Sequence, residues 1–265
     1  MMPRILTIAG SDSGGGAGIQ ADLKAITVMG GFGMTVITAL TAQNTLGVTA
    51  VFEVPPDFVA SQFDAVASDI GVDAAKTGML ANRRIVHAVA RKVREHGVSN
   101  LVVDPVMVAK SGDLLLSPEA RASMLDDLIP VAALVTPNLP EAAILSGMSV
   151  NDPDDMRRAA ERIRQCGVPN VLVKGGHLKD EAMDVLYDGR DFLELTSDRI
   201  QTKNTHGTGC AYSAAIACCL GHGRPVQEAV RLAKEFVTTA IRHGLSLGRG
   251  HGPVNSYAWI ARTKV

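Results

Sequence analysis

Clusters of glycine and polar residues recur along this 265-residue chain, each just after a short run of apolar, β-type residues. In an open parallel sheet, ligands bind outside the carboxyl ends of the strands. The clusters therefore predict one composite site, whose carboxylates, lysines and glycine-rich backbone suit the binding of phosphate and metal. They are residues 10–18, 43–44, 76–78, 104–105, 136–141 and 174–177.

A polar loop with glycines, residues 204–211, runs directly into a helix of small residues. Gly207 and Gly209 let successive backbone N–H groups converge, and the helix dipole adds positive potential, so this loop suits a phosphate or an oxyanion. Cys210 lies in the first helical turn, where the pKa of a thiol is lowered, and is a candidate base or nucleophile. The alternative is structural, with Thr208 as a helix cap and Cys210 as a buried apolar residue.

Two carboxylates, Asp104 and Glu141, follow neighbouring buried strands. Taken singly, each is an ordinary helix N-cap candidate. Together, facing a phosphate-binding loop, they suit a hydrated Mg²⁺, which takes one or two carboxylates plus phosphate oxygens. Lys174, at the end of the sixth strand, could neutralise the charge of a phosphate. The alternative is that it is an ordinary lysine at a solvated strand end, with the aliphatic part of its side chain packed against the protein.

The first glycine cluster admits two other interpretations. Gly16, Gly18 and Ala21 fit a relaxed dinucleotide-binding spacing, but the next strand ends at residues 41–44 without the acid that would hold a ribose. A strand-to-helix turn without a ligand also stays open. No GxxxxGK[ST] motif occurs, which excludes a P-loop kinase.

Composition narrows the function classes further. Lys and Arg total 26 against 27 Asp and Glu, so the net charge of −1 argues against a nucleic-acid binder. Cys166, Cys210, Cys218 and Cys219 show no CxxC metal spacing and indicate a reducing compartment. The longest weakly polar stretch, residues 210–220, is shorter than the ~20 residues of a membrane span, and the N-terminus favours a strand over a signal peptide. We therefore expect a cytoplasmic protein.

The hydrophobic pattern predicts one α/β domain over residues 1–265, with a mostly parallel central sheet covered by helices on both faces. An antiparallel hairpin, residues 184–187 and 192–195, is expected at one edge. The expected parallel strands are residues 4–9, 33–40, 74–79, 100–106, 133–136 and 170–174. The expected helices include residues 83–96, 153–166, 209–220, 226–243 and 256–262.

These motifs in this order resemble the ribokinase-like superfamily and, within it, the hydroxymethylpyrimidine and phosphomethylpyrimidine kinases of thiamine biosynthesis. The likeness covers nearly the whole chain. The stretches that carry it are residues 8–22, 39–45, 103–107, 136–142, 173–177, 205–210 and 250–255.

The resemblance implies a ribokinase-like fold and two ATP-dependent phosphoryl transfers. The first goes to the hydroxymethyl group of 4-amino-5-hydroxymethyl-2-methylpyrimidine, and the second converts the monophosphate to the diphosphate. It implies ATP and Mg²⁺, leaves a monovalent cation open, and makes a homodimer the expected assembly. The implied catalytic residues are Cys210, Gly207, Thr208 and Gly209; the pyrimidine-binding residues are Gln43, Asp22, Gly10, Met79 and Val106; the ATP-binding residues are Lys174, Asn138, Thr205 and His206; the metal ligands are Asp104 and Glu141.

The wider superfamily usually has an aspartate where this chain has Cys210, and the cysteine resembles the pyrimidine-kinase branch. We expect its thiolate to accept the proton of the substrate hydroxyl. Two alternatives stay open, a pyridoxal or pyridoxine kinase of the same superfamily and a non-catalytic small-molecule binding protein. Residues 109–113, polar and glycine-containing, are expected to form a lid, or else an ordinary loop.

Overall fold

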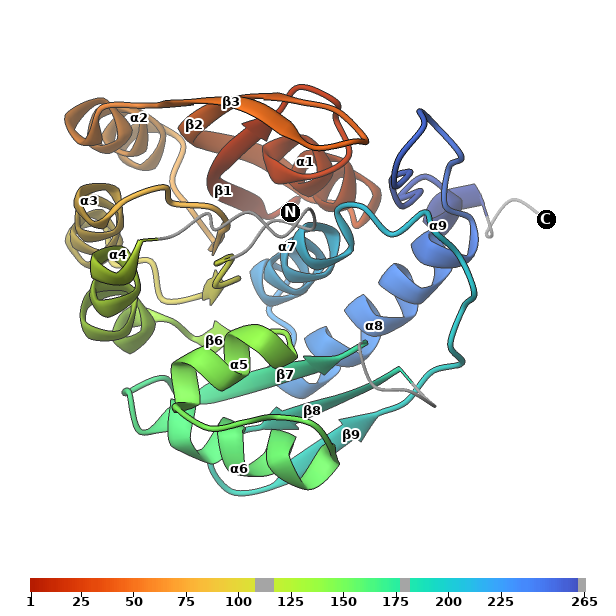
Figure 1. Ribbon diagram of the computed structural model, residues 1–265. Helices are drawn as coiled ribbons and strands as arrows, with labels where there is room; N and C mark the ends of the chain where they lie inside the picture. The colour runs from red at the N-terminus through yellow and green to blue at the C-terminus, as the bar shows by residue number, and fades with distance from the viewer. Residues whose placement is uncertain (108–116, 177–181, 262–265) are drawn as a thin grey trace.

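Nine strands form one sheet in the computed structural model, which describes residues 1–107, 117–176 and 182–261 (Figure 1). Their order is β3-β2-β1-β4-β5-β6-β7-β8-β9. The six central strands, β2, β1, β4, β5, β6 and β7, run parallel to one another, whereas β3 at one edge and the hairpin of β8 and β9 at the other pair antiparallel. This confirms the predicted α/β fold, including its antiparallel edge hairpin.

The strand bounds agree with most of the predicted segments. They are β1 Arg4–Asp12, β2 Phe32–Gln43, β3 Val48–Glu53, β4 Ala74–Thr77, β5 Leu101–Val103, β6 Leu134–Val135, β7 Asn170–Gly175, β8 Met183–Tyr187 and β9 Phe192–Leu195. The helices are α1 Gly18–Val28, α2 Pro56–Asp69, α3 Arg83–Glu95, α4 Pro118–Ser123, α5 Leu139–Ser146, α6 Pro153–Arg164, α7 Thr208–Gly221, α8 Val226–Arg242 and α9 Ala258–Ala261. A π-helical turn, Met124–Leu128, and a 3-10 turn, Ile129–Val131, follow α4.

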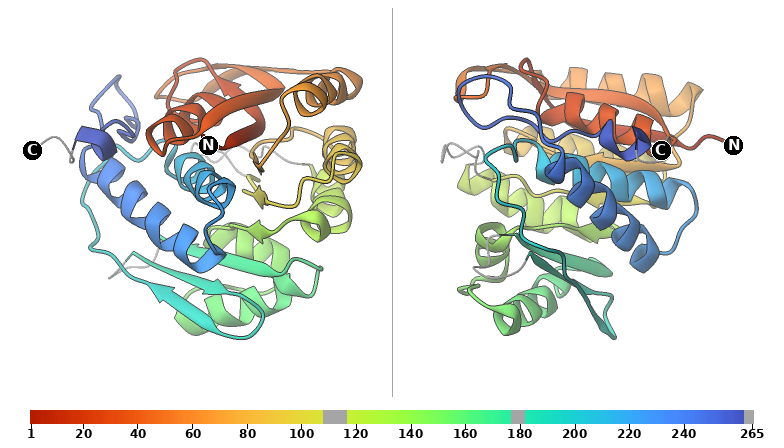
Figure 2. Two further views of the ribbon diagram at one scale, coloured as in Figure 1. Left: turned by 180° about the vertical axis from the view of Figure 1, so that it is seen from behind. Right: turned by 90° about the vertical axis from the view of Figure 1, so that its right-hand side faces the viewer.

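Helices cover both faces of the sheet (Figures 1 and 2). One face packs against α2, α3, α5 and α6 through a core rich in Val, Ile and Leu. The other packs against α1, α7 and α8 through a core rich in Ala and Cys. We call these the aliphatic face and the small-residue face.

Local sequence explains the helices of the aliphatic face. In α3 the buried residues recur at helical spacing, and the Asn82 side chain caps the helix by accepting a hydrogen bond from the Ile85 amide at 3.0 Å. In α6 the Asp152 side chain accepts from the Asp155 amide at 2.8 Å, and Pro153 occupies the first turn. Both helices were predicted because amphipathic spacing and caps are local signals.

Two features of the sheet differ from the prediction. Strand β1 continues through Asp12, because after a register shift between Ala9 and Ser11 the chain pairs again with β2. Strand β3 was not predicted; it pairs antiparallel with β2 and is almost wholly exposed. An exposed edge strand lacks the alternation of apolar and polar residues that identifies a strand with one buried face.

Helix α7 is buried on nearly every side, with ten consecutive buried residues from Ala211 to Leu220. It lies behind the centre of the sheet and contacts α1, α8, β4 and β5. Within the described ranges, no helix combines the length and the apolar composition needed to cross a bilayer. The apolar stretch 210–220 is therefore a core helix, and its burial fixes where its N-terminus points.

Candidate active site

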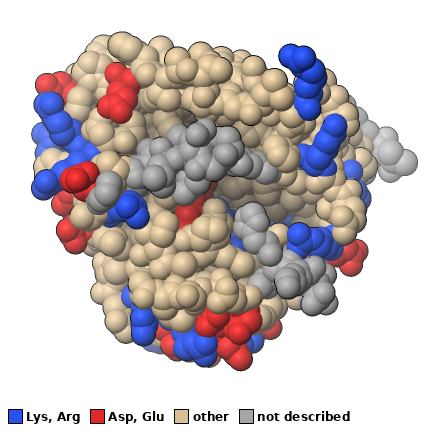
Figure 3. Space-filling view, in the orientation of Figure 1, with Lys and Arg blue, Asp and Glu red and all other residues tan. Residues whose placement is uncertain are grey.

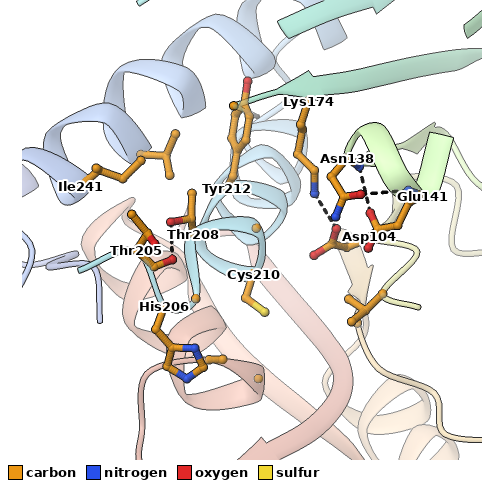
Figure 4. Close-up of a pocket in the computed structure, with 18 of the residues that line it drawn as sticks. Asp104, Asn138, Glu141, Lys174, Thr205, His206, Thr208, Cys210, Tyr212 and Ile241 are labelled. Carbon is orange, nitrogen blue, oxygen red and sulfur yellow. Dashed lines mark hydrogen bonds and ion pairs between the residues drawn. The ribbon is translucent and has the colours of Figure 1, made fainter. Parts of the chain in front are cut away.

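A cavity of about 760 Å³ lies at the carboxyl ends of the parallel strands, where the loops after β1, β4, β5 and β7 meet the N-terminus of α7 (Figure 4). The space-filling view shows this side hollowed near its centre, with charged side chains mainly toward the edges (Figure 3). The predicted lid, residues 109–113, lies outside the described residues.

The cavity is lined by every predicted site residue except Asp22. The lining residues from the prediction are Gly10, Gln43, Met79, Asp104, Val106, Asn138, Glu141, Lys174, Thr205, His206, Gly207, Thr208, Gly209 and Cys210. Asp22 lies behind the wall, fully buried, with its carboxylate paired to the Lys76 ammonium at 2.9 Å. The structure thus brings the six separate sequence clusters to one place.

The start of α7 is built to hold an anion. Gly207 caps the helix with φ +76°, and a Cβ there would lie 1.8 Å from the Gly16 carbonyl oxygen, so only glycine fits. The Thr208 hydroxyl donates to the Thr205 carbonyl at 2.7 Å, which braces the turn. The first amides of a helix have no intrahelical acceptor, and here the residues that carry them, 208–210, line the cavity.

An ion pair stands beside this turn. The Lys174 ammonium at the end of β7 donates to the Asp104 carboxylate at 2.8 Å, and the Ser213 hydroxyl of α7 donates to the same carboxylate at 3.3 Å. Burial alone raises the pKa of Asp104, but the charges of Lys174 and Lys76 outweigh burial and hold it below its ordinary value. Asp104 is therefore a carboxylate at neutral pH.

Glu141 has two roles in this structure. It forms a capping box with Asn138 at the start of α5, because each side chain accepts a hydrogen bond of 2.9 Å from the other residue's amide. Asn138 is therefore the N-cap and Glu141 the third residue of the helix, and both residues also line the cavity. Burial raises the pKa of Glu141 to about 7; Lys174 opposes the shift and Asp104 adds to it.

Asp104 and Glu141 place two oxygen-donor groups at adjacent strand ends. In the described ranges no cluster of three or more His, Cys, Asp or Glu could hold a metal by itself. Two carboxylates beside a phosphate site nevertheless suit Mg²⁺, which keeps waters and takes phosphate oxygens as further ligands. The pKa of Glu141 is raised chiefly by burial, so a cation bound at this corner would favour the ionised carboxylate.

Cys210 departs from the prediction. The sequence predicted a lowered thiol pKa at the helix start, but burial raises the pKa to about 11. The Lys76 charge and the Gly18 amide oppose that shift, whereas Asp22 and Asp104 add to it. The expectation of a lowered pKa is wrong because desolvation outweighs the helix dipole, so the thiol is protonated at neutral pH.

The residues predicted to hold a ring line the same cavity. A Cβ on Gly10 would lie 3.0 Å from the Met79 methyl carbon, so glycine leaves room there for that side chain. The Gln43 side-chain oxygen lies 3.1 Å from the Thr41 hydroxyl, which also donates to the Ser11 carbonyl at 2.8 Å, so the amide is held near the end of β1. A fixed amide can donate to one ring atom and accept from another.

His206 joins two loops that are far apart in sequence. Its Nε2 lies 3.0 Å from an Asp12 carboxylate oxygen. Asp12 in turn accepts hydrogen bonds from the amides of Gly14, Gly16 and Ala17. The imidazole therefore ties the glycine-rich loop after β1 to the turn before α7, a role that the sequence did not suggest.

Two buried lysine–aspartate pairs at the cavity were also missed. Lys76 of β4 pairs with Asp22, and Lys234 of α8 pairs with Asp184 of β8 at 2.7 Å. The sequence contains a signal for both lysines, because each is a charged residue in an apolar segment. Lys76 interrupts a buried strand, and Lys234 lies on the apolar side of an amphipathic helix, where an isolated charge needs a partner.

A mostly parallel α/β sheet with a glycine-containing helix start suited to an anion, a lysine beside it and two carboxylates is typical of a small-molecule phosphotransferase of the ribokinase-like type. A family model described as phosphomethylpyrimidine kinase matches residues 12–255. The chain belongs to this family.

Comparisons with individual proteins support this family assignment. The hydroxymethylpyrimidine/phosphomethylpyrimidine kinase of Rhizobium meliloti is 52% identical over 256 residues, covering 95% of this chain and 96% of that protein. The thiamine biosynthesis bifunctional protein ThiED of Geobacter sulfurreducens is 54% identical, and this chain spans about half of its length, 51%. An ADP complex of Bacillus subtilis pyridoxal kinase superposes with a TM-score of 0.92 at 42% identity, covering 97% of this chain and 98% of that one.

Proposed function

We propose that this chain transfers the γ-phosphate of ATP to the hydroxymethyl group of 4-amino-5-hydroxymethyl-2-methylpyrimidine and then phosphorylates the monophosphate to the diphosphate. The observation that carries this proposal is one cavity that is lined both by the glycine-containing turn at the start of α7 and by Gln43. Family membership supports the same activity. The whole chain, residues 1–265, acts as one domain.

The transfer needs positioning and charge stabilisation more than covalent chemistry. The N-terminal amides of α7, at Gly209 and Cys210, hold the transferring phosphoryl group, and Lys174 offsets the charge on its oxygens. Thr205, His206 and Asn138 line the part of the cavity that holds the nucleotide. His206 acts there by fixing the turn before α7. Gln43, with Gly10, Met79 and Val106, holds the pyrimidine in the same cavity.

Asp104 and Glu141 are the residues that would hold Mg²⁺. When bound, the ion neutralises phosphate charge and orients the phosphates for displacement. Glu141 is already held by the Asn138 amide, so its carboxylate is positioned by the start of α5. A requirement for a monovalent cation is tested by comparing K⁺ with Na⁺ in the same assay.

Cys210 lies where the acceptor oxygen meets the α7 turn. Its thiol is protonated in the ligand-free site, so proton acceptance requires that substrate binding lower its pKa. A loose phosphoryl-transfer transition state draws the acceptor proton off late, so a weak base suffices. We therefore expect replacement of Cys210 to change kcat more than KM.

The test is ADP release and product mass with Mg²⁺-ATP and each of five acceptors: hydroxymethylpyrimidine, its monophosphate, pyridoxal, pyridoxine and ribose. Turnover of both pyrimidines and little of the others is expected. Preference for pyridoxal would establish the second candidate, which the similarity to the Bacillus subtilis pyridoxal kinase favours. Pyrimidine binding without turnover would instead indicate a non-catalytic binding protein.

A cytoplasmic homodimer completes the proposal. The outer strand β3 exposes Val51 and Phe52, and the adjoining Leu40 of β2 is also exposed. An uncovered apolar sheet edge suits pairing with a second copy. Sedimentation equilibrium at micromolar concentration measures the mass; a monomer would contradict the expected assembly.

A further inference from the structure

Lys76 is a fully buried lysine that no step described above uses. Its ammonium makes two contacts with the Asp22 carboxylate, at 2.9 and 3.0 Å, and the Thr7 hydroxyl donates to that carboxylate at 2.6 Å. The lysine also lines the cavity. An ammonium has three donors, and across the described residues Asp22 is its only hydrogen-bond partner.

Strand register places Lys76 below the anion-holding turn. Ala74 of β4 packs in the small-residue core with α1 and α7. Side chains alternate along a strand, so Lys76 points to the same face, two residues nearer the carboxyl end. That position brings it toward the start of α7, and its charge acts on the Cys210 thiol. A Cβ on Gly78, a cavity-lining residue, would lie 3.0 Å from Lys76 Nζ.

The two proposed steps pose different electrostatic demands on this cavity. The first acceptor is a neutral alcohol, whereas the second carries a phosphate of about −1.5 to −2 charge near neutral pH. Lys174, which pairs with Asp104, is already assigned to the oxygens of the transferring phosphoryl group. Lys234 is engaged by both Asp184 and the Ala182 carbonyl. Among the three described lysines that line the cavity, Lys76 is the one that lies beside Gly78 and Met79 in the strand-to-loop segment after β4.

We infer that Lys76 binds the phosphate of the monophosphate acceptor, so that it determines acceptance of the second substrate while the alcohol does not need it. The inference rests on the proposed two-step function. The unengaged donor of Lys76 reaches the acceptor phosphate, and Asp22 holds the ammonium in place before either substrate binds. A pocket without this charge would phosphorylate the alcohol and then reject its own product.

The experiment measures KM and kcat for the alcohol and for the monophosphate, at saturating Mg²⁺-ATP, in wild type and Lys76→Gln. KM for the monophosphate is expected to rise about 10- to 100-fold, the effect of losing a hydrogen bond to a charged group. KM for the alcohol is expected to rise less than about threefold. Equal changes for the two acceptors would overturn the inference.

Asp22→Asn/Lys76→Gln is the second variant, because Lys76→Gln alone leaves a buried carboxylate without its countercharge. It removes both charges, and circular dichroism with a melting curve checks its fold. The same selective rise in KM for the monophosphate is expected, and its absence overturns the inference.

Lys234→Gln is the matched control, since it removes the other buried lysine of a lysine–aspartate pair at the same cavity. It is expected to change the kinetics of both acceptors by the same factor; selective loss of the monophosphate there would assign the role to Lys234 and overturn the inference. A wild-type protein that turns over neither pyrimidine would instead refute the proposed function.

Discussion

The two faces of the sheet are packed differently, and the difference locates the chemistry. On the aliphatic face, α3 and α6 bury one stripe of branched residues and expose the opposite side. On the small-residue face, α7 is enclosed on nearly all sides by α1, α8 and the sheet. Small side chains allow this close approach, so the N-terminus of α7 is held rigidly at the strand ends.

Much of the buried charge follows the same division, although Glu141 of α5, on the aliphatic face, is also a buried carboxylate at the cavity. Lys76, Asp22, Ser213 and Lys234 all lie on or against the small-residue face. Each of them is hydrogen-bonded within the protein. The aliphatic face supplies stability through apolar burial, while the small-residue face supplies positioned charge. Substitutions that are matched across the two faces test this division.

The largest expected effect contrasts two glycines with positive φ. Gly207→Ala places a Cβ 1.8 Å from the Gly16 carbonyl, whereas Gly97→Ala, after α3, meets nothing within 4 Å. We expect Gly207→Ala to lower kcat about 10²- to 10³-fold, comparable with loss of an oxyanion donor. Gly97→Ala should cost only about 1 kcal/mol of stability from its φ. Steady-state kinetics and urea unfolding measure both, and equal kinetic losses would contradict the contrast.

Cys210→Ala is expected to lower kcat about 10²-fold or more, the usual worth of a positioned proton acceptor. Cys166→Ala, on the aliphatic face and outside the cavity, should leave kcat unchanged. Near-normal turnover of Cys210→Ala would show that Cys210 is not the proton acceptor.

The pH dependence of the same pair sharpens this test. Because the pKa of Cys210 is raised to about 11, its thiolate fraction increases about tenfold per pH unit below that value. If the thiolate accepts the proton, kcat/KM, which follows ionisation of the free enzyme, rises from about pH 7 to 9 in wild type and in Cys166→Ala. The rise should be absent in Cys210→Ala; an unchanged slope would assign the ionisation to another group.

Packing provides a smaller contrast. Ala215→Leu overfills the enclosed core around α7 and should destabilise the protein by about 1–3 kcal/mol, with a fall in kcat because the helix start shifts. Ile85→Val in α3 should cost about 0.5–1.5 kcal/mol without a change in kcat. Urea unfolding and kinetics on both variants make the comparison; a kinetic change in Ile85→Val alone would reverse it.

The smallest effect concerns an ion pair at the amino end of the sheet, away from the site. Hydrogen bonds from Arg4 lower the pKa of Asp73 to about 2. However, 39% of the Arg4 side chain and 32% of the Asp73 side chain are exposed. Asp73→Asn should lower Tm by roughly 1–3 °C at neutral pH, after solvent screening. A carboxylate whose pKa is lowered by folding stabilises the folded protein above about pH 4. The Tm difference between wild type and Asp73→Asn should therefore vanish as the pH falls through 2. A difference that persists there would contradict the ion-pair origin.

Much of this protein could be predicted from local sequence. Caps and amphipathic spacing identified α3 and α6, continuous apolar runs identified most parallel strands, and glycine-containing loops identified the cavity. Each of these signals lies within about one element of the residues that it describes. The exposed edge strand β3 escaped because no buried face imposes a pattern on it.

Tertiary structure alone decided how the clusters combine. The pairing of Lys76 with Asp22 and that of His206 with Asp12 join residues 54 and 194 positions apart. The pKa of Cys210 likewise depended on burial that neighbouring residues do not reveal. Residue type and spacing determine which groups arrive at the strand ends, because helix and strand periods are local. Charge partners and desolvation depend on which elements pack together, and therefore only the folded chain decided them.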